Sequence, residues 1–254
     1  MAGTLNGASI KTASEIEAMR TGGKMLAQVL AFVGSEMAAG MTTDELDQLA
    51  ASEVKRLGGE AAFLGHEGFP KSICISVNDE VVHGIPGSRV LQTGDVVGLD
   101  FGVRYDGLVT DSAVTLPIGS MKAPARRLLN ATEAALMIGI DQATAGSRVG
   151  DISSAIQRHL QTANLGIIRE LAGHGVGREL WEEPQIPNYG RAGAGPVLKA
   201  GMTVAIEPMA TLGSPEITIL GDKWTIAARD GSLAAQFEHT ILITNGAPEI
   251  LTLA

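Results

Sequence analysis

A segment that occurs twice, 107 positions apart, is the strongest constraint on how this 254-residue chain can fold. Residues 90–100 read VLQTGDVVGLD and residues 197–207 read VLKAGMTVAIE, with four identical positions and the conservative end pairs Leu99/Ile206 and Asp100/Glu207. A weaker similarity, at an offset of 106, relates residues 39–46 to residues 145–152. Two matches in nearly the same register indicate that the chain consists of two related halves of about a hundred residues each.

The periodicity of apolar residues predicts the same order of elements in each half, helices first and strands after them. In the first half it predicts a helix capped by Ser14 and Glu17, a helix that begins at Thr42 and Glu45 and ends near 58–59, and strands near 72–77, 95–103 and 108–116. In the second half it predicts helices at 124–142 and 151–163 and strands near 202–207, 216–220, 223–229 and 234–244. The turn RYDG, at 104–107, fits a hairpin between two of these strands. The pattern therefore predicts an α+β fold in which helices cover an antiparallel sheet.

The length suffices for one large domain or two small ones, and the composition is that of a compact globular protein. The repeat places the halves at about 12–118 and 124–245, with an N-terminal tail at 1–11. The net charge of −9 and the pI near 5.0 argue against nucleic acid or an anionic membrane surface as the main partner. The longest apolar run, MLAQVLAFV, is far too short to span a bilayer. Because Cys74 is the single cysteine, no internal disulfide can form, and we expect a cytoplasmic protein.

Four acidic residues interrupt segments that otherwise read as buried strands: Asp100 in VVGLDFGV, Asp111 in TDSAV, Glu207 in TVAIEPMA and Glu238 in AQFEHTILI. A lone buried carboxylate costs several kcal/mol and tends to take up a proton. Any one of these acids alone is more simply placed on the solvent face of a one-sided sheet. Four of them in corresponding places of two halves, with no lysine or arginine in the same segments, favour a metal centre. Two divalent ions that share carboxylates, roughly 3.5–4 Å apart, suit so many acids better than one ion.

His174 is the best histidine candidate for a metal ligand. It lies in GHGVG, where the flanking glycines allow a close approach of backbone and metal. His159 lies on a predicted amphipathic helix, and His239 follows Glu238 on a strand and so points to the opposite face. His83, in VVHGIPG, is either a turn residue without a role or a residue that faces a substrate. A phosphate-binding interpretation of GHGVG fails because the segment lacks the Lys-Ser/Thr end of a P-loop.

Five segments together resemble the type I methionine aminopeptidases, and the similarity covers nearly the whole chain from about residue 10. They are NDEVVHGIPG, LDFGVRYDGLVTDSA, GHGVGRELWEEP, AIEPM and GSLAAQFEHTILIT. The resemblance implies the "pita-bread" fold of two pseudo-symmetric halves in a single catalytic domain. It also implies removal of the initiator methionine from nascent proteins with a small second residue, by a water activated by two divalent ions such as Mn, Fe, Co or Zn.

The resemblance also implies the role of each site residue. Asp100 binds one ion, Asp111 and Glu238 bridge both, and His174 and Glu207 complete the other. Glu207 is the general base, and His83 lies near the scissile amide. The methionine pocket is lined by Phe69, Cys74 and Trp224, for which plain core packing is the alternative. The implied partners are N-terminal methionyl peptides and the ribosome, without nucleic acid or membrane, and the implied state is a monomer.

The chain departs from the family at two places near the expected site. The family usually has Phe-His before the acids of GHGxGRxxHExP, and here Leu180 and Trp181 occupy these positions. The family segment GYHGYP is here GHEGFP, which contains His66, Glu67 and Phe69. Trp181 cannot exchange a proton, since its N–H only donates a hydrogen bond. A low-activity or non-catalytic binding member is therefore one alternative. An Xaa-Pro-type metallopeptidase of the same fold is the other. We expect His66 and Trp181 to contact the substrate.

Overall fold

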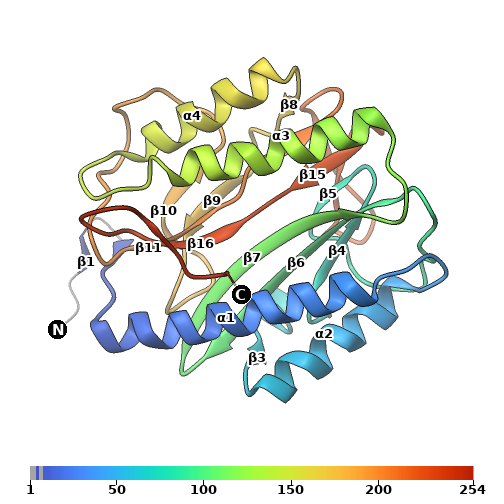
Figure 1. Cartoon of the computed structure of the whole chain (residues 1–254), viewed down its shortest axis with the longest axis horizontal. Coiled ribbons are helices and arrows are strands. Elements are labelled where there is room, and N and C mark those ends of the chain that lie inside the picture. Colours follow the sequence, from blue (N-terminus) through green and yellow to red (C-terminus); the bar gives the residue numbers. More distant parts are fainter. Residues whose placement is uncertain (1–3, 6–7, 254) are drawn as a thin grey trace.

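Four long helices cover the strands of the chain (Figure 1). The computed structural model describes residues 4–5 and 8–253. The helices are α1 (Ala13–Glu36), α2 (Thr43–Leu57), α3 (Ala123–Ile140) and α4 (Val149–Thr162), and a short 3₁₀ helix, η1, spans His66–Gly68. Each long helix is amphipathic: in α2, Leu46, Ala50 and Val54 recur every four residues and are all buried. Among the described residues, no helix is long and apolar enough to cross a membrane.

The strands form four sheets, and the two largest carry most of the site. One has the order β3 (Glu60–Ala61), β6 (Val96–Tyr105) and β4 (Cys74–Val77), with β7 (Leu108–Pro117) also paired to β6. The other has the order β1 (Thr4–Leu5), β2 (Ala8–Ser9), β10 (Glu182–Pro187), β9 (Ala172–Gly175), β11 (Thr203–Ile206), β16 (His239–Leu242) and β17 (Glu249–Ile250). The first small sheet has the order β15 (Ala234–Gln236), β12 (Met209–Thr211) and β8 (Gly166–Ile167). The second has the order β13 (Ile217–Ile219), β14 (Ile226–Ala228) and β5 (Glu80–Val82). Nearly all pairs are antiparallel, and β6 and β7 form the hairpin expected at RYDG.

The sequence repeat corresponds to repeated local structure. An isolated bridge joins Thr42 to Val90 in the first half, and a bridge at the equivalent positions joins Arg148 to Val197 in the second. Gly40 donates its N–H to the Leu91 carbonyl at 2.8 Å, and Gly146 donates to Leu198 at 3.0 Å. In Figure 1, α1 and α2 lie along one side of the strands, and α3 and α4 lie along the other. The chain therefore consists of two pseudo-symmetric halves, as the repeat predicted.

The two halves join along β7 and the segment before β16. Ala113 and Glu238 form a bridge, in which the Glu238 N–H donates to the Ala113 carbonyl at 2.9 Å. Side chains add to this seam: the Thr240 hydroxyl donates to the Asp111 carbonyl at 2.7 Å, and the Ser112 hydroxyl donates to the Glu238 carbonyl at 2.6 Å. Two of the four singled-out acids thus lie where the halves meet.

Several element boundaries differ from the sequence prediction. The cap of α1 is Thr12 with Glu15, not Ser14 with Glu17, although both pairs fit the same capping pattern. Glu15 also binds Arg178, whose Nε donates to its carboxylate at 2.8 Å, and this contact from the second half favours the earlier start.

Two predicted strands are shorter than expected. The strand expected at 202–207 ends at Ile206, and the strand expected at 234–244 is split into β15 and β16. Glu207 and Glu238 therefore lie at strand ends, not within strands. In the predicted N-terminal tail, β2 pairs with β10 between Ala8 and Glu183.

Gly94 and Gly201 occupy equivalent positions in the two halves but have different surroundings. Both have positive φ, at 97° and 87°, a region that costs other residues about 1–2 kcal/mol. A Cβ on Gly94 would meet nothing within 4 Å, whereas one on Gly201 would lie 2.9 Å from the Ile10 side chain. We expect Gly94→Ala to lower the free energy of unfolding by about 1–2 kcal/mol, and Gly201→Ala to lower it further. Urea unfolding measures both, and equal losses would contradict the contact with Ile10.

Candidate metal centre and substrate pocket

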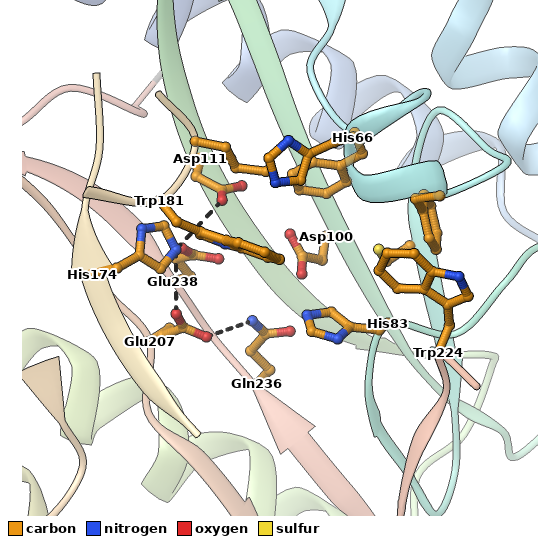
Figure 2. Close-up of a pocket in the computed structure, with 14 residues that line it drawn as sticks. His66, His83, Asp100, Asp111, His174, Trp181, Glu207, Trp224, Gln236 and Glu238 are labelled. Carbon is orange, nitrogen blue, oxygen red and sulfur yellow. Dashed lines mark hydrogen bonds and ion pairs between the residues drawn. The ribbon is translucent and has the colours of Figure 1, made fainter. Parts of the chain in front are cut away.

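Five side chains that the sequence singled out line one pocket at the junction of the two halves (Figure 2). Asp100 lies on β6, Asp111 on β7 and His174 on β9, while Glu207 follows β11 and Glu238 precedes β16. Residues from both halves are therefore needed to build the pocket.

Strand register explains why three of the acids share one face. Across an antiparallel pair, directly opposed residues point to the same side, as do residues two apart on one strand. Asp111 is opposite Gly102, two residues from Asp100, so these two carboxylates are diagonal neighbours. Glu238 is opposite Ala113, two residues from Asp111, and extends the diagonal.

The same register rule places the other two side chains. His174 is opposite Ala205, and Glu207 follows Ala205 by two residues. Gly173 and Gly175 allow the close approach of backbone that the sequence suggested. A Cβ on Gly173 would collide with the Ala205 carbonyl, and one on Gly175 would collide with the Glu183 carbonyl. The glycines therefore let β10, β9 and β11 pack closely around His174.

The orientation of the His174 ring leaves one nitrogen facing the acids. Its Nδ1 lies 2.9 Å from the Gly175 carbonyl, so Nδ1–H donates there and Nε2 keeps its lone pair. Nε2 lies 3.6 Å from Glu207 Oε1 and 3.9 Å from Asp111 Oδ2. Burial lowers the pKa of His174 to about 4, so the ring is neutral near pH 7. A lone pair that faces carboxylate oxygens is suited to a cation between them.

Burial also disfavours charge on the acids themselves. Desolvation raises the pKa of Asp100 to about 7. The pKa values of Asp111, Glu207 and Glu238 are raised too, first by desolvation and then by their acidic neighbours. Without a cation, this group of carboxyls therefore retains protons at neutral pH.

The donor atoms fit divalent metal ions. Asp111, His174 and Glu238 each offer one donor, and these three atoms lie within 4.8 Å of one another. Asp100 Oδ1, Asp111 Oδ1 and Glu238 Oε1 are buried without a hydrogen-bond partner among the described residues. Buried polar atoms normally have partners, so these oxygens are available as ligands. Carboxylate oxygens with one imidazole suit Mn, Fe, Co or Zn.

Apolar side chains line the other end of the pocket. Phe69 and Cys74 are buried, and the ring of Phe69 meets that of Trp224 edge-on, with centroids 5.2 Å apart. Cys74 is opposite Asp100 in the sheet, and burial raises the pKa of its thiol, so it stays neutral. This end can receive an unbranched apolar side chain.

The remaining histidine and tryptophan candidates divide into two groups. His66, His83 and Trp181 line the pocket, and His83 has a left-handed backbone with φ of 59°. Burial lowers the pKa of His83 to about 4. His239 lies outside the pocket, as expected, with its Nδ1 2.8 Å from the Thr252 hydroxyl. His159 is half-buried on α4.

Gln236 is the main site residue that sequence reasoning missed. It is buried, lines the pocket, and donates from Nε2 to Glu207 Oε2 at 3.3 Å. Its signal was the period of two along AQFEH, which puts it on the same face as Glu238. Phe63 and Leu180 also line the pocket, whereas Glu67 is exposed and is not among the lining residues.

The fold and this group of carboxylates with one histidine are those of a class of metal-dependent peptidases. Residues 17–245 match metallopeptidase family M24, so the chain belongs to this family. The alternative of an Xaa-Pro-type enzyme is not favoured: a prolidase from Pyrococcus furiosus shares the fold at a TM-score of 0.76, but at a sequence identity of only 22%. The match covers 96% of this chain and 65% of that one.

Within the family, the chain groups with the methionine aminopeptidases. It is 44% identical to methionine aminopeptidase 1 of Bacillus subtilis over 95% of this chain and 98% of that protein. The solved methionine aminopeptidase of Thermotoga maritima is 43% identical with a TM-score of 0.96, over 97% of this chain and 100% of that one. These matches confirm the family and the pita-bread fold that the sequence motifs implied.

The raised pKa of Asp100 makes a prediction for the metal-free protein. The folded-state pKa of Asp100, about 7, exceeds the ordinary value of 3.8, so the folded protein binds this proton more tightly than the unfolded chain does. The stabilisation that the proton provides is complete below pH 3.8 and is lost as pH rises toward 7. We expect Asp100→Asn to raise the Tm relative to wild type at pH 8 but not at pH 4, by about 2–4 °C per kcal/mol gained. Thermal unfolding in chelator measures this. The exposed Asp106→Asn is the control, and a pH-independent difference for Asp100→Asn would contradict the prediction.

Proposed function

We propose that this chain hydrolyses the first peptide bond of proteins that begin with methionine and have a small second residue. The observation that carries the proposal is the single pocket in which five metal-donor side chains adjoin an apolar end that suits a methionine side chain. The named relatives among methionine aminopeptidases support it.

In this proposal two divalent ions bind at the seam of the halves. Asp100, Asp111, His174, Glu207 and Glu238 would hold the ions, with Asp100 at one end of the group and His174 with Glu207 at the other. Support comes from the unpartnered oxygens of Asp100, Asp111 and Glu238 and from the free Nε2 of His174. When bound, such ions activate water and polarise the carbonyl at neutral pH.

Glu207 and His83 have separate proposed roles around the scissile amide. Glu207 takes a proton and passes it to the leaving amine. This role suits its carboxyl group, because burial raises the pKa of Glu207. His83 stays neutral near pH 7 and offers a hydrogen bond to the amide or to the charge that develops there. Gln236 orients Glu207 through its 3.3 Å hydrogen bond.

The setting belongs to the same proposal. Residues 1–254 act as one catalytic domain, because both halves supply donors to the same pocket. A monomer in the cytoplasm, where methionyl chains leave the ribosome, fits a chain whose single thiol is buried and neutral. The second candidate, a low-activity or binding member, is favoured only by Trp181 at the place where the family usually has histidine.

Metal-dependent release of methionine is the direct test. We expect a protein loaded with Mn, Fe, Co or Zn to release methionine from Met-Ala-Ser but not from Met-Lys-Ser, and chelator to abolish release. Glu238→Gln should lower kcat/KM by at least about 100-fold, because even residues that only support a ligand typically cost about 10–100-fold when they are changed. His239→Gln, one residue away on the opposite face, is the matched control and should stay near wild type. No release from Met-Ala-Ser with any of the four metals would refute the proposal.

Metal binding should release protons. The raised pKa values of Asp100, Asp111, Glu207 and Glu238 keep part of this group protonated, and metal binding requires the ionised form. The apparent affinity for Mn²⁺ should therefore increase as pH rises from 5 to 8. Titration calorimetry in two buffers of different ionisation enthalpy counts the protons released. An affinity that does not change with pH would show that the carboxyls are already ionised.

A further inference from the structure

Trp181 lies between the pocket and a second, adjoining groove. The groove is lined by residues of β5, β9, β10 and β12, among them Gln185 and Met209, and by Leu171, which precedes β9. Four residues line both spaces: His83, His174, Trp181 and Glu207. A chain that has its first side chain in the pocket and continues into the groove must pass these four residues.

The indole is the largest and most exposed of these four boundary side chains. Trp181 is 44% exposed, whereas His174 is buried and His83 is half-buried. Figure 2 shows the indole reaching from the His174 side toward the middle of the pocket. An indole that is exposed at the mouth of a pocket is available to contact a ligand.

Contacts on both sides of Trp181 hold its backbone in place. Leu180 is buried in the core. Glu182 binds Lys11 Nζ at 2.6 Å, in an ion pair whose side chains are only 9% and 1% exposed. The N–H groups of Arg178 and Glu179 also donate to the Glu182 carboxylate, at 2.6 and 3.2 Å. The segment that carries the indole therefore cannot withdraw without breaking a buried ion pair.

A residue from the first half supports the indole itself. The ring of His66 meets the Trp181 ring edge-on, with centroids 4.8 Å apart and an interplanar angle of 84°. Aromatic pairs prefer this geometry. His66 lies in η1, so the two rings close the pocket from opposite halves.

We propose that the Trp181 indole, supported by His66, is a wall that limits the size of the second residue of the substrate. This rests on the proposed function, since the first side chain must occupy the apolar end beside Phe69 and Trp224. With that end filled, the second side chain lies at the boundary with the groove, against the indole. A bulky side chain there would have to displace a ring that is fixed by its neighbours. A hydrophobic wall of this kind typically discriminates about 10–200-fold per methylene group.

The test compares peptides that differ only in the second residue, Met-Ala-Ser and Met-Val-Ser, in the metal-loaded wild type and three variants. Relative to wild type, Trp181→Ala should raise the kcat/KM ratio of Met-Val-Ser to Met-Ala-Ser about 10-fold or more. Trp181→Phe keeps an aromatic wall and should keep the ratio within about 3-fold. Ile219→Ala removes an apolar side chain that is 63% exposed elsewhere and should change neither peptide.

Binding of the same peptides to the metal-free protein, measured by calorimetry, separates this proposal from the proposed function. If wild type releases no methionine from either peptide, the proposed function fails, and the ratio of the two dissociation constants still tests the wall. The proposal would be overturned if Trp181→Ala left the preference between the two peptides unchanged, measured as kcat/KM or, without turnover, as dissociation constants. A Trp181→Phe protein that accepts Met-Val-Ser as well as Trp181→Ala does would also overturn it.

Discussion

The placement of four carboxylates in one largely buried pocket is the constraint on which the rest of the structure depends. Asp100, Asp111 and Glu238 are at most 8% exposed, and each has one oxygen without a hydrogen-bond partner among the described residues. Like charges in a low-dielectric interior repel strongly, so the group must either retain protons or share cations. Divalent ions would stabilise the charged form of these carboxylates, which cannot all be ionised without a cation. This favours a metal site where the two halves meet.

The pseudo-symmetric fold is what brings the acids together. Each half contributes diagonal neighbours across an antiparallel pair, Asp100 with Asp111 in the first and His174 with Glu207 in the second. The seam between the halves adds Glu238 through its bridge to Ala113. Because side-chain hydroxyls bind backbone carbonyls at this seam, the register of the two sheets is fixed at the point where the donors converge.

Local pattern was sufficient to predict the two halves and the acids and histidine that meet in one pocket, because a repeat at a nearly constant offset and acids within or beside apolar strands are visible in the sequence alone. Contacts between distant segments were not predictable. The choice of Thr12 over Ser14 as the cap of α1 depends on Glu15 meeting Arg178, 163 positions away. The edge-on contact between His66 and Trp181 likewise joins the two halves, and no spacing along the chain indicates it.

Anomalous X-ray diffraction from crystals loaded with Mn²⁺ tests the central claim most directly. The account predicts two anomalous peaks in the pocket, roughly 3.5–4 Å apart, with Asp111 and Glu238 between them. Asp100 should lie at one peak, and His174 with Glu207 at the other. Manganese peaks elsewhere on the protein and none among these five side chains would contradict the account.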